Sequence, residues 1–333
     1  MSSDVEVSLS RRRALMVGGS IAAGLATVGF PDVALSANGA LPSGKPQSAP
    51  EGSSVQAGGT LPVKQMEEIL RTDGNVTDGV LAISQDRKDL HVKGPGGIPV
   101  KPAWEVKHEF AFQSIADGKA VISGELSLLS KEANPVIDQI LKHGLIFQAL
   151  HQHFLDLSPQ LFHIHFRGVG NPLDLARAVA AVVGATGTPL PQKSAAEPKT
   201  PLDKDKLEKI LGGTAEVADD GVVVVSVPRK ETIVVGGVAW KSEMGVSHTV
   251  AFQPLDGGKR TAVAPDFALI ASEINPLVQL MREQGFTIHC LYNQETAESP
   301  QLYFSHQLAV GDAYDLARKI RNGLERTNTK FKT

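Results

Sequence analysis

The sequence predicts an α+β fold that is built twice, as two tandem homologous domains, each a mostly antiparallel sheet with helices packed on one face. Residues 132–177 match residues 273–318 without a gap, with 16 identities in 46 positions, which indicates an internal duplication. Each copy shows the same order of strand, strand, helix, strand, strand, helix. The length of 333 residues and the hydrophobic content of 42% suit two domains of about 130 residues each.

The copies also share predicted elements upstream of this match. Each copy opens with a short helix, a buried strand and a half-buried strand of alternating apolar and polar residues. These pairs lie at residues 66–70 and 207–211, 80–84 and 222–226, and 107–113 and 247–253.

Recurring Asn-Pro pairs predict where the later helices begin. Asn134-Pro135 and Asn275-Pro276 each predict an N-cap followed by proline at the first helical position, and Asn171-Pro172 repeats this pattern. Gly144 and Gly285 are expected to end the two earlier helices. Because both copies keep these features, we expect them to be structural.

Composition predicts the segment boundaries. We expect a Tat signal peptide at residues 1–36, a flexible linker at 37–61, a first repeat at 62–186, a proline-rich linker at 187–203 and a second repeat at 204–329.

The first segment has the organisation of a bacterial export signal. Three arginines, Arg11 to Arg13, precede the uncharged apolar run Met16–Phe30, and small residues lie just before Ala37. The apolar run is too short and glycine-rich for a comfortable membrane span. We therefore expect a periplasmic or secreted protein exported by Tat, with no transmembrane span in the mature chain.

Composition and motifs also argue against several classes of function. The net charge is −3 and no long basic run occurs, which argues against a nucleic-acid partner. The chain has neither a phosphate-binding loop nor a Gly-x-Ser-x-Gly motif. Cys290 is the only cysteine, so no intramolecular disulfide can form, and its distance from the signal excludes a lipobox cysteine. We expect it to be a buried small hydrophobic residue.

Four histidines of the first copy fall in one predicted hairpin, with strands at residues 145–155 and 160–168 joined by a tight connection centred on Ser158-Pro159. If the hairpin is symmetric about Ser158, the facing pairs are His153 with His163 and His151 with His165, and all four imidazoles project from the same side of the sheet. The opposite face then carries the core residues Phe154, Phe162, Ile164 and Phe166.

Three such imidazoles can converge on one ion at about 2.0–2.1 Å, which leaves a fourth position for water. Zinc is the first expectation and copper the second, because imidazole suits both. The alternative is a histidine-rich, solvated sheet face without a ligand.

The second copy has lost most of this cluster. It has Tyr292, Gln294 and Phe304 in place of His151, His153 and His163, and keeps only His306 for His165. We therefore expect a single site in the first repeat and a degenerate site in the second. His289 is expected to point away from the site.

Other polar residues have open or structural interpretations. Glu125, which matches Asp266, could be a metal ligand, a partner that orients an imidazole, a general base or a solvated acid. His108 and His248 occur in both copies, which favours a structural role. His143 is expected to lie exposed at a helix end.

These residues carry a resemblance to a known bacterial family. Residues 132–135, Gly144, the run Ala149-Leu150-His151-Gln152-His153 and the His165-Phe166 pair are similar to the signature of the LppY/LpqO family of exported proteins, a domain of unknown function. The resemblance spans most of the mature chain in two copies. It implies His151, His153 and His165 as the family positions, whereas His163 departs from the pattern.

Two hypotheses follow for the function. The first is an exported envelope protein that binds a metal through His151, His153 and His165, with His163 or water completing the site. Such a centre could act as a metal-dependent hydrolase with Glu125 as base. The second is a non-catalytic envelope module with incidental histidines, which binds glycan, peptide, another small molecule or a partner. Its oligomeric state is left open.

Overall fold

The computed structural model describes residues 59–194 and 197–332, so the predicted signal peptide and nearly all of the first linker lie outside the described residues. The described residues belong to one compact unit. The expected α+β fold of two tandem domains, each with an antiparallel sheet and helices, is confirmed.

Each repeat supplies one set of elements. The first contains α1 (Val63–Leu70), β1 (Asn75–Thr77), β2 (Val80–Asp86), β3 (Val92–Lys93), η1 (Pro95–Gly97), β4 (Pro99–Val100), α2 (Pro102–Glu105), β5 (Lys107–Ser114), β6 (Ala120–Leu128), α3 (Ser130–Lys142), β7 (Ile146–His151), β8 (Phe162–Gly170) and α4 (Pro172–Val183). The second contains α5 (Lys204–Leu211), β9 (Thr214–Val217), β10 (Val223–Val227), β11 (Ile233–Val235), β12 (Val238–Trp240), η2 (Ser242–Met244), β13 (His248–Leu255), η3 (Asp256–Gly258), β14 (Arg260–Leu269), α6 (Ala271–Glu283), β15 (Thr287–Ile288), β16 (Glu298–Ser299), β17 (Tyr303–Gly311) and α7 (Ala313–Leu324).

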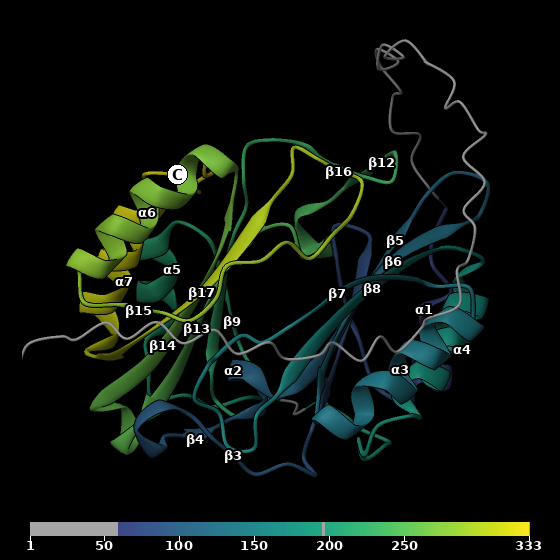
Figure 1. The fold of residues 1–333 in the computed structure, drawn as a ribbon, viewed down its shortest axis with the longest axis horizontal. Coiled ribbons are helices and arrows are strands. Elements are labelled where there is room, and N and C mark those ends of the chain that lie inside the picture. Colours follow the sequence, from purple (N-terminus) through teal and green to yellow (C-terminus); the bar gives the residue numbers. More distant parts are fainter. Residues whose placement is uncertain (1–58, 195–196, 333) are drawn as a thin grey trace, which may run out of the picture. The chain divides into compact units, whose positions relative to one another are not determined.

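The two large sheets have the same strand order. One runs β1-β2-β5-β6-β8-β7, and the other runs β9-β10-β13-β14-β17-β15. All neighbouring strands in both sheets pair antiparallel. Helices α1, α3 and α4 pack on the outer face of the first sheet, and α5, α6 and α7 pack on the outer face of the second (Figure 1).

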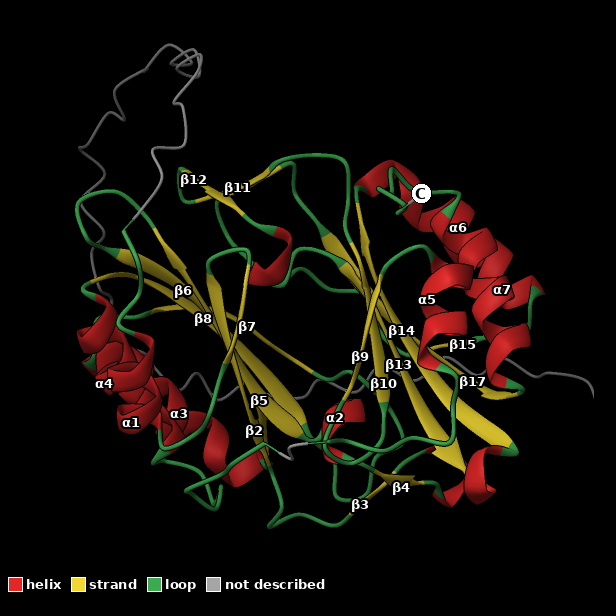
Figure 2. Cartoon of the chain, turned by 180° about the vertical axis from the view of Figure 1, so that it is seen from behind, coloured by secondary structure: helices red, strands yellow, loops and turns green. Residues whose placement is uncertain are grey.

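The inner faces of the two sheets contact each other through two apolar clusters that mix residues of both repeats. Trp104 and Phe154 pack with Ala264 in one cluster, and Val121 packs with Trp240 in the other. Figure 2 shows α2 between the two sheets. Burial of both inner faces supplies a hydrophobic driving force for the association of the repeats.

Matched hydrogen bonds join the repeats. The Gln253 side chain accepts from the backbone N–H of Lys101 (2.8 Å) and donates to the carbonyl of Pro99 (2.6 Å). The Gln113 side chain does the same in the other direction, accepting from Lys241 (2.8 Å) and donating to Ala239 (2.9 Å). Each repeat thus binds a backbone segment of the other repeat through one glutamine side chain. Both glutamines are buried.

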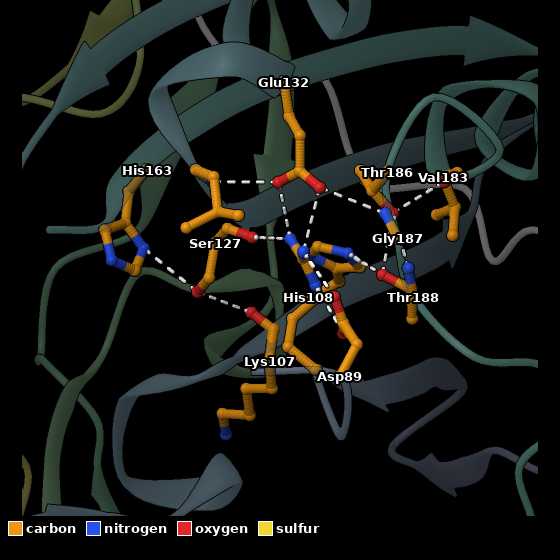
Figure 3. A network of polar contacts seen from close by, with 12 residues as sticks. Asp89, Lys107, His108, Ser127, Glu132, His163, Val183, Thr186, Gly187 and Thr188 are labelled. Atoms are coloured by element: carbon orange, nitrogen blue, oxygen red, sulfur yellow. Dashed lines mark hydrogen bonds and ion pairs between the residues drawn. The ribbon is translucent and has the colours of Figure 1, made fainter. Parts of the chain in front are cut away.

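A buried arginine organises the end of each sheet in the same way. Arg87 donates to Glu132, Asp89 and the carbonyl of Ser127, and Figure 3 shows Glu132 also accepting from Gly187. In the second repeat, Arg229 binds Glu273, Glu231 and the carbonyl of Ala268, and Asn328 donates to Glu273. Gly187, which lies in the predicted linker, therefore donates to a glutamate of the first repeat in the same way as Asn328 donates to a glutamate of the second.

The predicted starts of two helices were wrong. α3 begins at Ser130 and α6 at Ala271, so Pro135 and Pro276 lie inside these helices. The physical reason is the glutamate three residues after each N-cap: Glu132 accepts from the backbone N–H of Leu129 (2.8 Å) and also binds Arg87. These two bonds fix the helix start earlier than the Asn-Pro pair suggested.

Other helix signals were correct. Asn171 caps α4 and accepts from Leu173 (2.9 Å), with Pro172 at the first helical position. Gly144 follows the C-cap of α3 with a φ of 68° and Gly285 follows that of α6 with a φ of 91°, a conformation that favours glycine.

The prediction of a tight hairpin was also wrong. β7 ends at His151 and β8 begins at Phe162, so ten residues join them. His151 pairs with His163, and Ala149 pairs with His165. The reason is that Phe154, Leu157 and Leu161 leave the sheet to fill the apolar cluster between the two inner faces. Phe154 therefore belongs to that cluster, while Ile164 and Phe166 lie in the helix-covered core as expected.

Among the residues that the structure describes, no helix combines the length and apolar composition needed to cross a membrane.

Candidate metal centre

The polar centre of the molecule lies between the two inner faces. On β14, Asp266 stands between Ala264 of one apolar cluster and Ala268 of the other. On β17, which pairs with β14, His306 directly faces Asp266. In the first repeat, His165 of β8 faces Glu125 of β6 in the matching register. Each repeat therefore contributes one carboxylate and histidine pair.

All four histidines of the predicted hairpin converge at this place. The ring of His151 lies 5.0 Å from that of His165 and 4.9 Å from that of His153, between ring centroids. The rings of His153 and His163 stack at 3.5 Å. The observed register differs from the expected one by two residues, an even number. The histidines therefore still share one face of the sheet, as expected, although the facing pairs differ.

Several sets of side chains could hold a metal ion. His151, His153 and His165 each offer one ligand atom, and these atoms lie within 4.8 Å of one another. Two other groups meet the same limit: Glu105 with His153 and His306, and Glu125 with His153 and His163. His153 belongs to all three groups, so it lies at the middle of the cluster.

Buried polar atoms without partners mark the same place. Among the described residues, neither ring nitrogen of His151 has a hydrogen-bond partner, and Nε2 of His165 also lacks one. Buried polar atoms are nearly always satisfied by protein, water or an ion. Lone pairs that converge without donors are the usual form of a metal site.

The protonation states favour three of the histidines as ligands. Burial lowers the pKa values of His151, His153 and His165, for His165 to about 4. These imidazoles are therefore neutral near pH 7 and can donate lone pairs. His163 differs: burial lowers its pKa, but Glu105 and then Glu125 more than offset this and raise it. A protonated His163 has no lone pair, which agrees with its place as the weakest predicted ligand.

Glu125 faces three of the histidines and is partly open to solvent. Its carboxylate lies 2.9 Å from Nδ1 of His163, 3.4 Å from Nε2 of His153 and 3.9 Å from Nε2 of His165. Burial raises its pKa, but His165 and His163 outweigh burial and hold the pKa well below its ordinary value. With its side chain 25% exposed, Glu125 is an ionised, partly exposed carboxylate beside the histidines.

Sequence reasoning missed Glu105. This last residue of α2 is buried, and its carboxylate lies 2.8 Å from Nε2 of His163 and 3.1 Å from Nδ1 of His153. Burial raises its pKa, and the nearby His163 only partly offsets this. No signal in the sequence linked Glu105 to the hairpin, because the contact depends on where α2 lies between the sheets.

Side chains of the second repeat contact the histidine cluster of the first. The Tyr292 ring stacks on the His151 ring at 3.6 Å, and its hydroxyl lies 3.5 Å from Nε2 of His153. The His306 ring stacks on that of His153 at 3.7 Å. The available signal was that the second copy keeps both Asp266 and His306.

Cys290 also lies at the edge of this cluster. Its Sγ is 3.3 Å from Nδ1 of His306, and burial raises the pKa of the thiol. The side chain is half-buried rather than fully buried. It therefore remains a neutral thiol near pH 7.

The remaining histidines lie outside these groups. Nε2 of His108 is 2.7 Å from the Thr188 hydroxyl, and His248 has the matching contact with Thr329 at 3.1 Å. Figure 3 shows His108 beside this threonine, while Ser127 contacts His163 (3.4 Å). His289 packs against the Phe154 ring at 5.0 Å. His143 is exposed at the C-cap of α3, as expected.

Fold and site together define a two-repeat α+β protein with a buried cluster of histidines and carboxylates between its sheets. The chain belongs to the family described as Domain of Unknown Function (DUF1259), which matches residues 64–185 and 205–326. No curated protein matches the chain.

Proposed function

We propose that this protein binds one transition metal ion through His151, His153 and His165, in the centre between its two repeats. Zinc is the first choice and copper the second, because a set of neutral imidazoles suits both ions. The observation that carries the proposal is the convergence of three histidine ligand atoms within 4.8 Å of one another. Two of these histidines also have buried nitrogens without partners among the described residues.

Three protein ligands leave a fourth position for water, which is the arrangement of catalytic zinc sites. Glu125 lies beside the same imidazoles, and its side chain is 25% exposed, against 3% for that of Glu105. A metal ion held there would act as a Lewis acid that activates water toward an ester, amide or lactone, and we propose that Glu125 is the base placed to accept a proton from that water. The alternative is a non-catalytic module that binds an envelope ligand.

The place of action follows from the first 36 residues. Their twin arginines and short apolar run support export by Tat to the periplasm or the outside of the cell. Since Tat carries folded proteins, the metal centre between the repeats would be assembled before export.

Metal content tests the binding proposal. The chain is purified without a histidine tag, dialysed against zinc and against copper, and analysed by mass spectrometry for bound metal. We expect about one ion per chain in the wild type, and loss of that ion in His151→Ala with His153→Ala. His143→Ala is the matched control, because this histidine is exposed and remote from the cluster. Substoichiometric metal in the wild type, or metal retained in the double variant, would contradict the proposal.

A further inference from the structure

A second site is suggested by a cavity in the second repeat that shares no residue with the metal centre. The cavity has a volume of about 700 Å³. Its walls come from residues 228–233 between β10 and β11, from Trp240 and the segment after it, and from the C-terminal residues 330–332. It is large enough for a small organic ligand.

Positive charge gathers on its walls. Lys230, Lys330 and Lys332 all line the cavity and are exposed. The carboxylate on the wall, Glu231, is held by Arg229 through two hydrogen bonds of 2.8 and 3.1 Å. Lys332 also lies 3.4 Å from Glu208, an exposed pair that contributes little. The ammonium groups of all three lysines are therefore available to attract an anion.

Comparison of the two repeats shows that this charge is peculiar to one of them. Gly187 and Asn328 make the same bond to their glutamates, and Thr188 and Thr329 make the same contact with their histidines. The next three positions therefore correspond. They are Pro189, Leu190 and Pro191 in the first repeat, and Lys330, Phe331 and Lys332 in the second.

The residues of the opposite wall can be matched between the two repeats in the same way. Arg87 and Arg229 bind matching glutamates, so Lys88 corresponds to Lys230 and Leu90 to Thr232. A lysine is common to both repeats at the first of these positions, but the second repeat adds two lysines and a hydroxyl where the first has apolar residues. A requirement of the fold alone would act on both repeats, so this difference points to a ligand.

The types of donor indicate a phosphate. Lysines act as point charges that suit a tetrahedral anion, whereas planar carboxylates are best bound by a free arginine. The arginine here is already engaged by Glu231 and Glu273. The hydroxyls of Thr214 and Thr232 add donors.

Apolar side chains also line the cavity. They are Ile233, Trp240, Val246 and Phe331, and the volume of the cavity exceeds that of a phosphate alone. We infer that this cavity binds a phosphorylated molecule that carries an apolar group, with the phosphate on Lys230, Lys330 and Lys332.

Calorimetry on the full chain tests this inference with 1-naphthyl phosphate as the soluble probe and 1-naphthol as its uncharged match. Vesicles of phosphatidylcholine with and without phosphatidic acid form a second arm, which distinguishes a lipid phosphate from a soluble one. The variants are Lys330→Gln with Lys332→Gln, and Lys230→Gln. Lys88→Gln is the matched control at the corresponding exposed position of the first repeat. Unchanged thermal unfolding midpoints establish that each variant is folded.

We expect the phosphorylated probe or the phosphatidic acid vesicles to bind, and the double variant to weaken this binding by about tenfold or more, equivalent to about 1.4 kcal/mol. Lys230→Gln should also weaken it, while Lys88→Gln should not. Binding of neither probe, equal binding of 1-naphthol, or equal weakening by Lys88→Gln would overturn the inference.

Discussion

The ring of His153 in the first repeat stacks on the ring of His306 in the second, with centroids 3.7 Å apart and planes inclined by 18°. The contact joins residues of opposite repeats at the middle of the polar cluster. Because His153 belongs to every group of described residues that could hold a metal, the packing of the two repeats affects the proposed binding site.

Replacing either inter-repeat glutamine should destabilise the whole protein. Gln113→Leu removes one side chain that bonds two backbone groups of the other repeat, at Ala239 and Lys241. Leaving these groups unpaired should lower the free energy of unfolding by about 2–3 kcal/mol. Urea denaturation measures this. Gln279→Leu is the control, because Gln279 is exposed and bonds only within α6. Equal effects of the two substitutions would contradict the account of the interface.

Breaking a buried ion pair should cost more than breaking an exposed one. Arg87 is fully buried and binds Glu132 at 2.9 Å, so Arg87→Met leaves a buried carboxylate without its partner. We expect a loss of about 3–5 kcal/mol in the free energy of unfolding. Arg177→Met breaks the exposed pair with Asp174 and should change it by less than about 1 kcal/mol. A small effect of Arg87→Met in urea denaturation would show that the network does not stabilise the fold.

Two buried glutamates of the second repeat should make stability depend on pH. Burial, and then Glu298, raises the pKa of Glu295 to about 8, while burial raises that of Glu298 to about 7. A raised carboxyl pKa means that the folded state holds the proton longer than the unfolded state. The stability from these groups is thus present below about pH 4.5 and is lost as pH rises toward 7 and 8.

Glu295→Gln should flatten this part of the pH dependence. Each group can contribute up to about 1.4 kcal/mol per pH unit while the folded state holds one extra proton. Urea midpoints at about pH 5.5 and pH 8.5 measure the difference for wild type and variant. Glu216→Gln, on the exposed part of β9, is a suitable control. If the Glu295→Gln protein keeps the full wild-type loss of stability, the assignment is wrong.

The chemical proposal makes a separate prediction about Glu125. Glu125→Gln should leave the zinc content unchanged but lower kcat for hydrolysis of 4-nitrophenyl acetate by about 10²-fold or more, the usual contribution of a general base. Loss of zinc in this variant would instead make Glu125 a ligand. Unchanged kcat would exclude Glu125 as the base, and an absence of hydrolysis by the zinc-loaded wild type would favour the non-catalytic alternative.

Much of the fold was predictable because the signals are local. Alternation located β5 and β13, and the caps at Asn171, Gly144 and Gly285 located helix ends that the structure confirms. The misplaced starts of α3 and α6 have a non-local cause. Glu132 is fixed by Arg87, which is 45 residues away in sequence. Local capping rules do not take such a distant residue into account.

The candidate site was predictable only in part, for the same reason. Alternate residues of a strand point to the same face, so His151, His163 and His165 share one face in any hairpin register that differs from the expected one by an even number of residues. The contributions of Glu105, Tyr292 and His306 depend on the packing of the repeats, which the duplication did not reveal. The second copy lost its own cluster, but it supplies side chains to the cluster of the first.

The position of the metal tests the central claim most directly. Crystals of the zinc-loaded wild type should give one anomalous peak at the zinc edge, about 2.0–2.1 Å from a nitrogen of each of His151, His153 and His165. A peak at an exposed histidine such as His143, or no peak between the two sheets in a protein that retains zinc, would contradict it.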